Sequence, residues 1–281
     1  GNCAFKGCVS IARFNSDVAV ELMIPQNTVT VVDYAFENLP LITDVVVPDS
    51  VETIGCGAFQ YCSSIENITV PFVGNTMNAT FSKQVFGYIF GYSAGGSSST
   101  PNTGEFRDAK YGTQPEGTTW QWTTYYYPGY GSSYGSSCYY YIPTTIKNVT
   151  VTLQDHVPAC AFRNCSFIES IVLPEETTII NDYAFENCDA LINLNGTGIN
   201  IPDSVESIEI NAFKHCVSAA SLSVPSSVTT INNYAFDGCS SLLSVEFSEG
   251  VETLGTNSFS NCILLSYLEL PSSLKTIGTN A

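Results

Sequence analysis

The sequence predicts a repeat solenoid of α/β type with little regular helix, built from a unit of 23 residues. Three observations predict this fold: a recurring Ala-Phe-x-x-Cys marker, a fixed apolar spacing around it, and a single long segment that interrupts both. The marker Phe stands at residues 5, 36, 59, 162, 185, 213, 236 and 259, and four of the intervals between successive members are 23. In such a fold each unit packs chiefly against its neighbours, so chain length reflects the number of stacked units.

The apolar positions of one unit predict a short strand in each repeat. The unit reads Pro-x-x-Val-x-x-Ile-x-x-x-Ala-Phe-x-x-Cys-x-x-Leu-x-x-Ile-x-Val-Pro, and the copy from Pro48 to Pro71 follows it with Ile65 in place of Leu. Neither a helical nor a simple strand period describes the whole unit, but its last part alternates as a short strand does. Proline then ends the strand, because it cannot donate to a ladder. One strand per unit predicts a parallel sheet along one face of the solenoid.

The cysteines are interpreted mainly as buried thiols. Seven of the 11 cysteines stand at the marker position, where a small side chain with a weak donor can pack and meet backbone groups; they are Cys8, Cys62, Cys165, Cys188, Cys216, Cys239 and Cys262. An odd total excludes complete pairing within the chain. A local disulfide between Cys3 and Cys8, or between Cys160 and Cys165, stays open as an alternative.

With these residues in view, the unit resembles the BspA-type leucine-rich repeat, over about residues 1–71 and 143–281. The resemblance implies a right-handed leucine-rich-repeat coil with short parallel strands on a concave face. It also implies a cell-surface or secreted protein with an adhesive role. The chain is accordingly divided into an N-terminal repeat block (1–71), an insertion (72–142) and a C-terminal repeat block (143–281).

Composition excludes several classes of partner. With 26 acidic and 9 basic residues the formal charge is −17, so nucleic acid and anionic membranes would be repelled. No apolar run reaches the roughly 18 to 20 residues of a membrane helix. The chain opens inside a repeat and stops one residue before the next marker Phe, so we expect a monomeric fragment whose export signal or anchor lies outside it.

The insertion is the first candidate binding surface. It holds both tryptophans and 11 of the 16 tyrosines among Gly, Ser and Thr, a composition similar to that of binding loops. The candidate ligand-binding residues are Trp120, Trp122, Tyr125, Tyr126, Tyr127, Tyr130 and Tyr134. In the alternative interpretation, these aromatic residues cover an edge of the solenoid and the Gly-Ser run is a flexible linker. The first part of the insertion, which includes Val85, Phe86, Ile89 and Phe90, is apolar enough to pack on the repeats.

The outward side chains of the predicted strands form the second candidate surface. Such concave surfaces commonly bind partners in solenoids. The candidate residues here are Glu66, Thr69, Lys147, Glu169, Ser221, Glu246, Tyr267 and Glu269. They are polar and mildly acidic, so a merely solvated sheet face is the alternative.

Catalytic chemistry is not expected. His156 and His215 lie in different repeats, and the pair His215-Cys216 is interpreted as a surface residue beside a buried thiol, not as a base and its nucleophile. No catalytic set, metal site or cofactor is predicted. We expect a non-enzymatic adhesion module that recognises a protein or glycan at a host or microbial surface. The alternatives are a structural spacer without a specific ligand and an enzyme, which would require convergent titratable groups.

Overall fold

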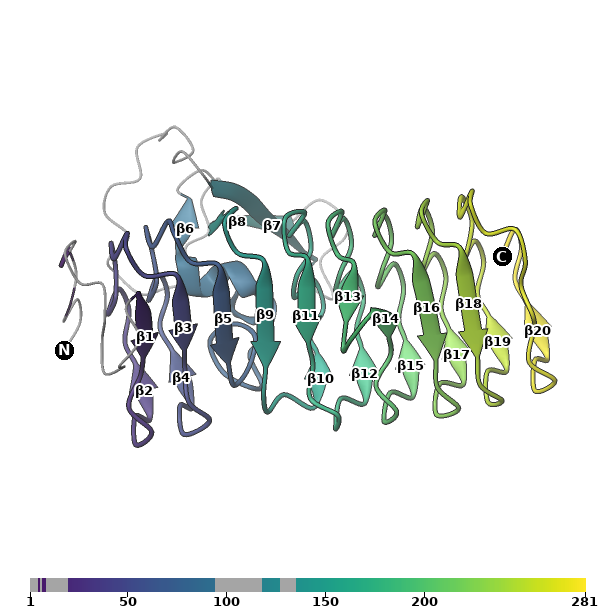
Figure 1. Ribbon diagram of the computed structural model, residues 1–281, viewed down its shortest axis with the longest axis horizontal. Coiled ribbons are helices and arrows are strands. Elements are labelled where there is room, and N and C mark those ends of the chain that lie inside the picture. The colour runs from purple at the N-terminus through teal and green to yellow at the C-terminus, as the bar shows by residue number, and fades with distance from the viewer. Residues whose placement is uncertain (1–4, 6, 9–19, 94–117, 127–134) are drawn as a thin grey trace.

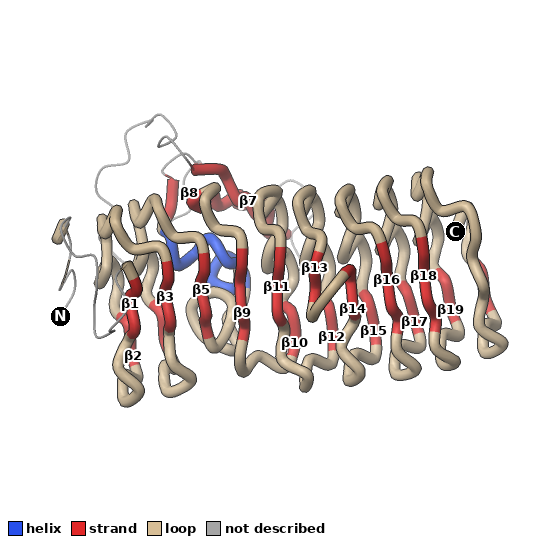
Figure 2. Tube along the Cα trace, in the orientation of Figure 1, coloured by secondary structure: helices blue, strands red, loops and turns tan. Residues whose placement is uncertain are grey.

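The computed structural model describes residues 5, 7–8, 20–93, 118–126 and 135–281, and it forms a single row of stacked coils (Figure 1). The chain enters at one end of the row and leaves at the other. Short strands alternate with loops in every coil (Figure 2). The predicted solenoid of parallel strands with little helix is confirmed, since two 3-10 helices are the only helices in the described part of the chain.

Successive coils contribute strands to a nine-stranded parallel sheet, which we call the front sheet (Figure 1). The repeat sets the register, so that Asp44 pairs with Asn67 and Leu222 with Val245. Along a strand, buried and outward positions alternate as the pleat requires. The strands are β1 (Glu21–Met23), β3 (Asp44–Val46), β5 (Asn67–Val70), β9 (Asn148–Val151), β11 (Ser170–Val172), β13 (Asn193–Leu194), β14 (Gly198–Asn200), β16 (Ser221–Val224) and β18 (Ser244–Phe247).

Two-residue strands form a second, narrower layer of each coil. They pair in parallel with the same repeat register, as Thr253 does with Thr276. The short layer consists of β2 (Thr30–Val31) with β4 (Thr53–Ile54), and of β10 (His156–Val157), β12 (Ile179–Ile180), β15 (Ser207–Ile208), β17 (Thr230–Ile231), β19 (Thr253–Leu254) and β20 (Thr276–Ile277). The apolar core lies between the two layers and the marker turns.

Each marker turn needs two left-handed residues, which explains a sequence feature that apolar spacing does not. In one turn Tyr183 and Asn187 both have φ of 59°, on either side of Ala184 and Phe185. Asn and Gly tolerate this conformation better than most residues. The second position after the marker Phe is accordingly filled by Gly7, Asn38, Asn164, Asn187, Gly238 and Asn261, with Tyr61 and His215 in the other turns.

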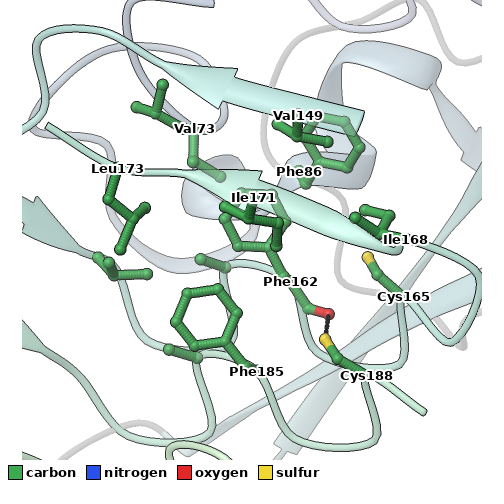
Figure 3. Packing of buried hydrophobic residues seen from close by; sticks show 14 of the residues in the cluster. Val73, Phe86, Val149, Phe162, Cys165, Ile168, Ile171, Leu173, Phe185 and Cys188 are labelled. Carbon is green, nitrogen blue, oxygen red and sulfur yellow. Dashed lines mark hydrogen bonds between the residues drawn. The ribbon is translucent and has the colours of Figure 1, made fainter. Parts of the chain in front are cut away.

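The marker phenylalanines stack through the core, and the stack continues across the insertion. Ring centroids of Phe162 and Phe185 lie 5.5 Å apart. Between Phe59 and Phe162, the missing rung is supplied by Phe90, 6.5 Å from Phe59, and by Phe86, 5.3 Å from Phe162. Figure 3 shows Phe86 in the same buried cluster as Phe162. The prediction that this apolar part of the insertion packs on the repeats is therefore confirmed.

The insertion leaves the front sheet continuous. Asn67 in β5 pairs with Asn148 in β9, so the 81 residues that separate them replace a repeat of 23 and add 58. After β5 the chain passes through the 3-10 helices η1 (Phe81–Gln84) and η2 (Phe86–Phe90). It then forms a three-stranded antiparallel sheet from β6 (Tyr92–Ser93), β7 (Thr118–Tyr126) and β8 (Gly135–Pro143), beside the marker turns (Figure 1).

A second irregularity adds a strand to the front sheet alone. β14 pairs in parallel with β13 only five residues after it, as Asn193 faces Gly198. In the narrow layer β12 pairs directly with β15, so β14 has no counterpart there. The longer interval of 28 from Phe185 to Phe213, which is 23 plus 5, thus builds one extra front strand. Gly198 has φ of +83°, and a Cβ there would lie 2.1 Å from Ser221 Oγ.

Candidate functional site

Gln121 fixes the insertion hairpin to the solenoid. Its side chain is fully buried, and its Oε1 accepts a hydrogen bond from the Gly87 N–H at 2.6 Å. Its Nε2 donates to the carbonyl oxygens of Ala161 at 2.9 Å and Cys160 at 3.3 Å. One side chain therefore joins β7 to η2 and to the marker turn of the next coil. The composition of the insertion gave no indication of this role.

Two more buried or half-buried glutamines secure the same region. Gln84 Nε2 donates to the carbonyl oxygen of Ala159 at 2.8 Å. Gln154 Oε1 accepts from the Val73 N–H at 2.9 Å, and its Nε2 donates to the Met77 carbonyl at 3.0 Å. Buried polar groups are costly unless bonded, so these paired amides specify one docked position for the start of the insertion.

The hairpin carries four of the predicted aromatic residues on a described strand. Trp120 and Trp122 occupy the register positions on either side of Gln121, opposite Tyr141 and Tyr139. Tyr125 and Tyr126 lie at the end of the same strand, whereas Tyr127, Tyr130 and Tyr134 lie outside the described residues.

Part of the aromatic content serves the core. Tyr140 is fully buried and Tyr88 is 6% exposed, with ring centroids 6.4 Å apart. Gly87 makes this packing possible, because a Cβ at residue 87 would lie 2.5 Å from Tyr140 Cβ. These two tyrosines therefore pack against the solenoid and are not part of an exposed aromatic surface.

The outer face of the front sheet presents polar side chains in rows that cross the coils. Asn67 Nδ2 donates to Asp44 Oδ1 at 2.7 Å, and Asn148 Nδ2 donates to Asn67 Oδ1 at 2.7 Å. In the next row, Lys147 Nζ lies 2.9 Å from Glu169 Oε1. This part of the face is therefore a connected, solvent-facing polar surface.

The predicted front-face residues lie together as the repeat implies, with one correction. The backbone N–H of Lys147 donates to Glu66 O, and that of Glu169 donates to Lys147 O, so these three lie in one column across successive coils. Thr69, Ser221 and Glu246 lie outward on β5, β16 and β18. Tyr267 and Glu269 occupy the equivalent positions of the last coil, but no strand forms there, because this segment makes no ladder with β18.

Sequence reasoning missed three exposed apolar residues on the same face. Val172, Ile192 and Leu243 are 42%, 44% and 59% exposed. Ile192 and Leu243 stand in the column of Glu66, Lys147 and Glu169, immediately after the core Leu of the unit. That position could have been read as outward from the repeat, so the signal was available in the sequence.

The marker cysteines form a ladder of free thiols, as predicted. Cys188 Sγ donates to the Phe162 carbonyl oxygen of the preceding coil at 3.1 Å (Figure 3), and Cys62 Sγ donates to the Phe36 carbonyl at the same distance. Cys216, Cys239 and Cys262 repeat this contact. Burial raises the pKa of the Cys62 thiol to about 12, so the neutral form is held in the core.

Neither candidate disulfide is supported by the described thiols. Cys8, Cys160 and Cys165 are free, and Cys3 lies outside the described residues. Cys8 differs from the other marker cysteines in being exposed.

The histidines take structural positions. His215 Nδ1 lies 3.1 Å from Asn187 Oδ1, and Asn187 Nδ2 donates to Asn164 Oδ1 at 2.8 Å, which makes a polar row along the marker turns. His156 Nδ1 lies 2.7 Å from Asp155 at the other side of the coil. Within the described ranges, no three His, Cys, Asp or Glu side chains are grouped as metal ligands would be.

Alternating charges join the same turns. Lys214 Nζ lies 3.1 Å from Asp237 Oδ2 and 5.1 Å from the ring centroid of Tyr234. Arg163 pairs with Glu186 and lies over the Tyr183 ring in the same way. These contacts repeat at adjacent coils and link the turns to one another, so they account for basic side chains that would otherwise suggest a binding site.

The fold and these surfaces define a repeat scaffold that displays side chains on a continuous sheet face. The BspA type Leucine rich repeat region family matches residues 1–88, 132–196 and 155–281 in six copies, and the chain belongs to that family. A search of curated proteins found no match. No helix in the described part of the chain is long and apolar enough to cross a membrane.

Solved structures of leucine-rich repeat proteins are similar at low sequence identity. A leucine-rich repeat protein from T. pallidum is 18% identical, with a TM-score of 0.41 over 88% of this chain and 78% of that one. A leucine-rich cell surface protein from Faecalibacterium prausnitzii is 16% identical, with a TM-score of 0.42 over 100% of this chain and 76% of the other.

Proposed function

We propose that this chain is a non-enzymatic binding module exposed at a cell surface or secreted, which recognises a protein or a glycan. The observation that carries the proposal is the front sheet, whose outward side chains are aligned across nine strands into one continuous face. Solenoids use such extended faces to bind partners. The family membership and the cell-surface relative support the same function.

The hairpin provides a second candidate surface, beside the marker turns. A hairpin that is already held in place loses less conformational entropy when a ligand binds, so more of the contact free energy is left for affinity. Gln121 supplies this support, with hydrogen bonds to η2 and to the next marker turn. Trp120 and Trp122 flank it on β7 and stay the leading candidates for stacking on a sugar ring or anchoring in a protein.

The test is an array of glycans and extracellular matrix proteins, probed with the wild-type chain and two double variants. Trp120→Ala with Trp122→Ala removes the hairpin aromatics, and Glu66→Ala with Glu169→Ala alters the front face. A matched control, Glu52→Ala with Glu206→Ala, removes two exposed carboxylates elsewhere. We expect a specific ligand whose binding is lost in one double variant and kept in the control.

Two outcomes would contradict the proposal. The chain could bind nothing on the array, which would favour the structural spacer. A ligand could also bind equally to all variants, which would place recognition outside both surfaces.

A further inference from the structure

The C-terminal half of the front face differs in chemistry from the N-terminal half. In the column after the core Leu, the first coils present Glu66, Lys147 and Glu169, whereas later coils present Ile192 and Leu243. We call Val172, Ile192, Leu243 and Glu246 the C-terminal front patch. Ile192 and Leu243 lie in one row across the strands, and Val172 and Glu246 lie in another. Its apolar members are 42%, 44% and 59% exposed.

These apolar side chains belong to one surface. The Ile192 N–H donates to Glu169 O at 3.0 Å, and the Leu243 N–H donates to Ala220 O at 2.8 Å, so each continues the same column from coil to coil. Val172 pairs with Thr150 in the register and takes the outward position that Thr holds on the neighbouring strand. The positions of Ile192 and Leu243 are separated by three strand spacings, β13 to β14 to β16 to β18. That separation is about 14 Å.

The extra strand β14 contributes to the shape of this patch. It lies between the strands that follow Ile192 and Ala220, and it widens the front sheet without adding a strand to the narrow layer. Its outward surface is reduced at one position, because Gly198 stands where β13 has Asn193 and β16 has Ser221, while Asn200 takes its other outward position. The row of Ile192 and Leu243 therefore runs beside a position without a side chain.

The charge around the patch has one sign. Glu246 is exposed on β18, and Glu269 is exposed at the equivalent position of the last coil. Beyond Arg163, the described basic side chains are Lys214 and Lys275, and these are paired with Asp237 at 3.1 Å and Glu252 at 2.7 Å, away from the front sheet. Glu169 at the N-terminal border is already paired with Lys147. A partner that covers the patch must therefore supply its own positive charge.

We propose that the C-terminal front patch docks a protein segment that carries Lys or Arg beside apolar side chains. The apolar side chains would cover Val172, Ile192 and Leu243, and the basic groups would meet Glu246 and Glu269. Long basic side chains suit this position, since their methylene stems can lie on apolar surface while the charge stays near solvent. This inference rests on the proposed binding function and names the class of partner for one of its surfaces.

The probe is a synthetic amphipathic peptide of Lys and Leu, compared with a Glu and Leu peptide of the same pattern, in a fluorescence anisotropy titration. We expect the Lys peptide alone to bind the wild-type chain. Ile192→Ser with Leu243→Ser should weaken binding by at least about tenfold, as the loss of two apolar contacts predicts. Val29→Ser with Ile210→Ser, which changes two exposed apolar residues off the front sheet, should bind as the wild type does.

A second pair of variants separates the patch from the general acidity of the chain. Glu246→Gln should weaken binding more than Glu206→Gln, although both remove one exposed carboxylate. Equal losses in both serine variants would show that the peptide responds to exposed apolar residues anywhere on the chain. Equal losses in both glutamine variants would show that it responds only to net charge, and either result would overturn the inference. So would failure of the Lys peptide to bind. If the arrays yield a ligand whose affinity is unchanged by Ile192→Ser with Leu243→Ser, the proposed function stands and only this inference falls.

Discussion

The backbone N–H of Gly87 donates to Gln121 Oε1 at 2.6 Å, a contact between residues that are 34 positions apart and both buried. It joins η2, which completes the phenylalanine stack, to the strand that carries both tryptophans. Gln121 therefore connects the hairpin to the core by hydrogen bonds, beside the packing of Tyr140 on Tyr88.

Gln121→Leu should detach the hairpin. The substitution leaves the Gly87 N–H without its partner, and an unsatisfied buried group costs about 1–3 kcal/mol. It also removes one of the two hydrogen bonds to the Ala161 carbonyl, which still accepts from the Phe86 N–H. Trp120 and Trp122 are the only tryptophans in the chain, so the shift of intrinsic fluorescence reports on the hairpin directly. The control Gln26→Leu makes the same change at an exposed residue. If Gln121→Leu has the emission and the stability of the wild type, the Gln121 hydrogen bonds do not hold the hairpin in place.

Phe185→Ala should be among the most destabilising substitutions. Phe185 is fully buried between Phe162 and Phe213, with ring centroids at 5.5 Å and 4.9 Å. Truncating such a ring costs about 3–5 kcal/mol. Phe247 is half-buried and meets Phe259 edge-on at 6.1 Å. Phe247→Ala should therefore lower the free energy of unfolding clearly less than Phe185→Ala does. Urea unfolding of both variants measures the difference, and equal losses would contradict the stacked core.

The thiol ladder should make stability fall at alkaline pH. The ordinary thiol pKa is 9.0, and burial raises the pKa of Cys62 to about 12 and that of Cys262 to about 11. Above pH 9 the unfolded chain loses these protons first, so the stabilisation is complete below pH 9 and is lost as the pH rises towards 12.

The urea midpoint, measured at about pH 8 and about pH 10, checks this expectation. Cys62→Ala should lose less stability between the two values than the wild type does, because one raised pKa is gone. Cys8→Ala is the matched control, since Cys8 is exposed. If Cys62→Ala and the wild type lose the same stability between the two pH values, the buried thiols are not the cause of the alkaline loss of stability.

Gly238→Ala should destabilise the turn for two separable reasons. Gly238 has φ of +78°, and a Cβ there would lie 2.3 Å from Cδ2 of His215. A residue forced into sparsely populated backbone space costs about 1–3 kcal/mol. In a His215→Ala background the ring contact is removed, so Gly238→Ala should lower the stability by a smaller amount that is still above zero. A thermal unfolding cycle measures this, and an unchanged loss would leave the backbone conformation as the sole cause.

The repeat pattern alone predicted the solenoid, the parallel strands, the buried Ala-Phe pairs and the free thiols. These features repeat because each coil contacts mainly its neighbours, so local spacing carries the information. The positions of Cys188 and Phe185 follow from their place in the unit. The same logic extends to Ile192 and Leu243, whose outward position follows from the unit.

Tertiary structure decided what the period does not encode. That Phe86 and Phe90 supply the missing rung, that Gln121 bonds to η2 and a marker turn, and that five added residues become strand β14 all depend on contacts between segments outside the repeat. Such contacts are chosen by packing and by the need to satisfy buried amides, and these requirements leave no period in the sequence. The repeats thus specify the scaffold, while the placement of its two irregular segments, and with it the shape of the binding surfaces, is fixed only in the folded chain.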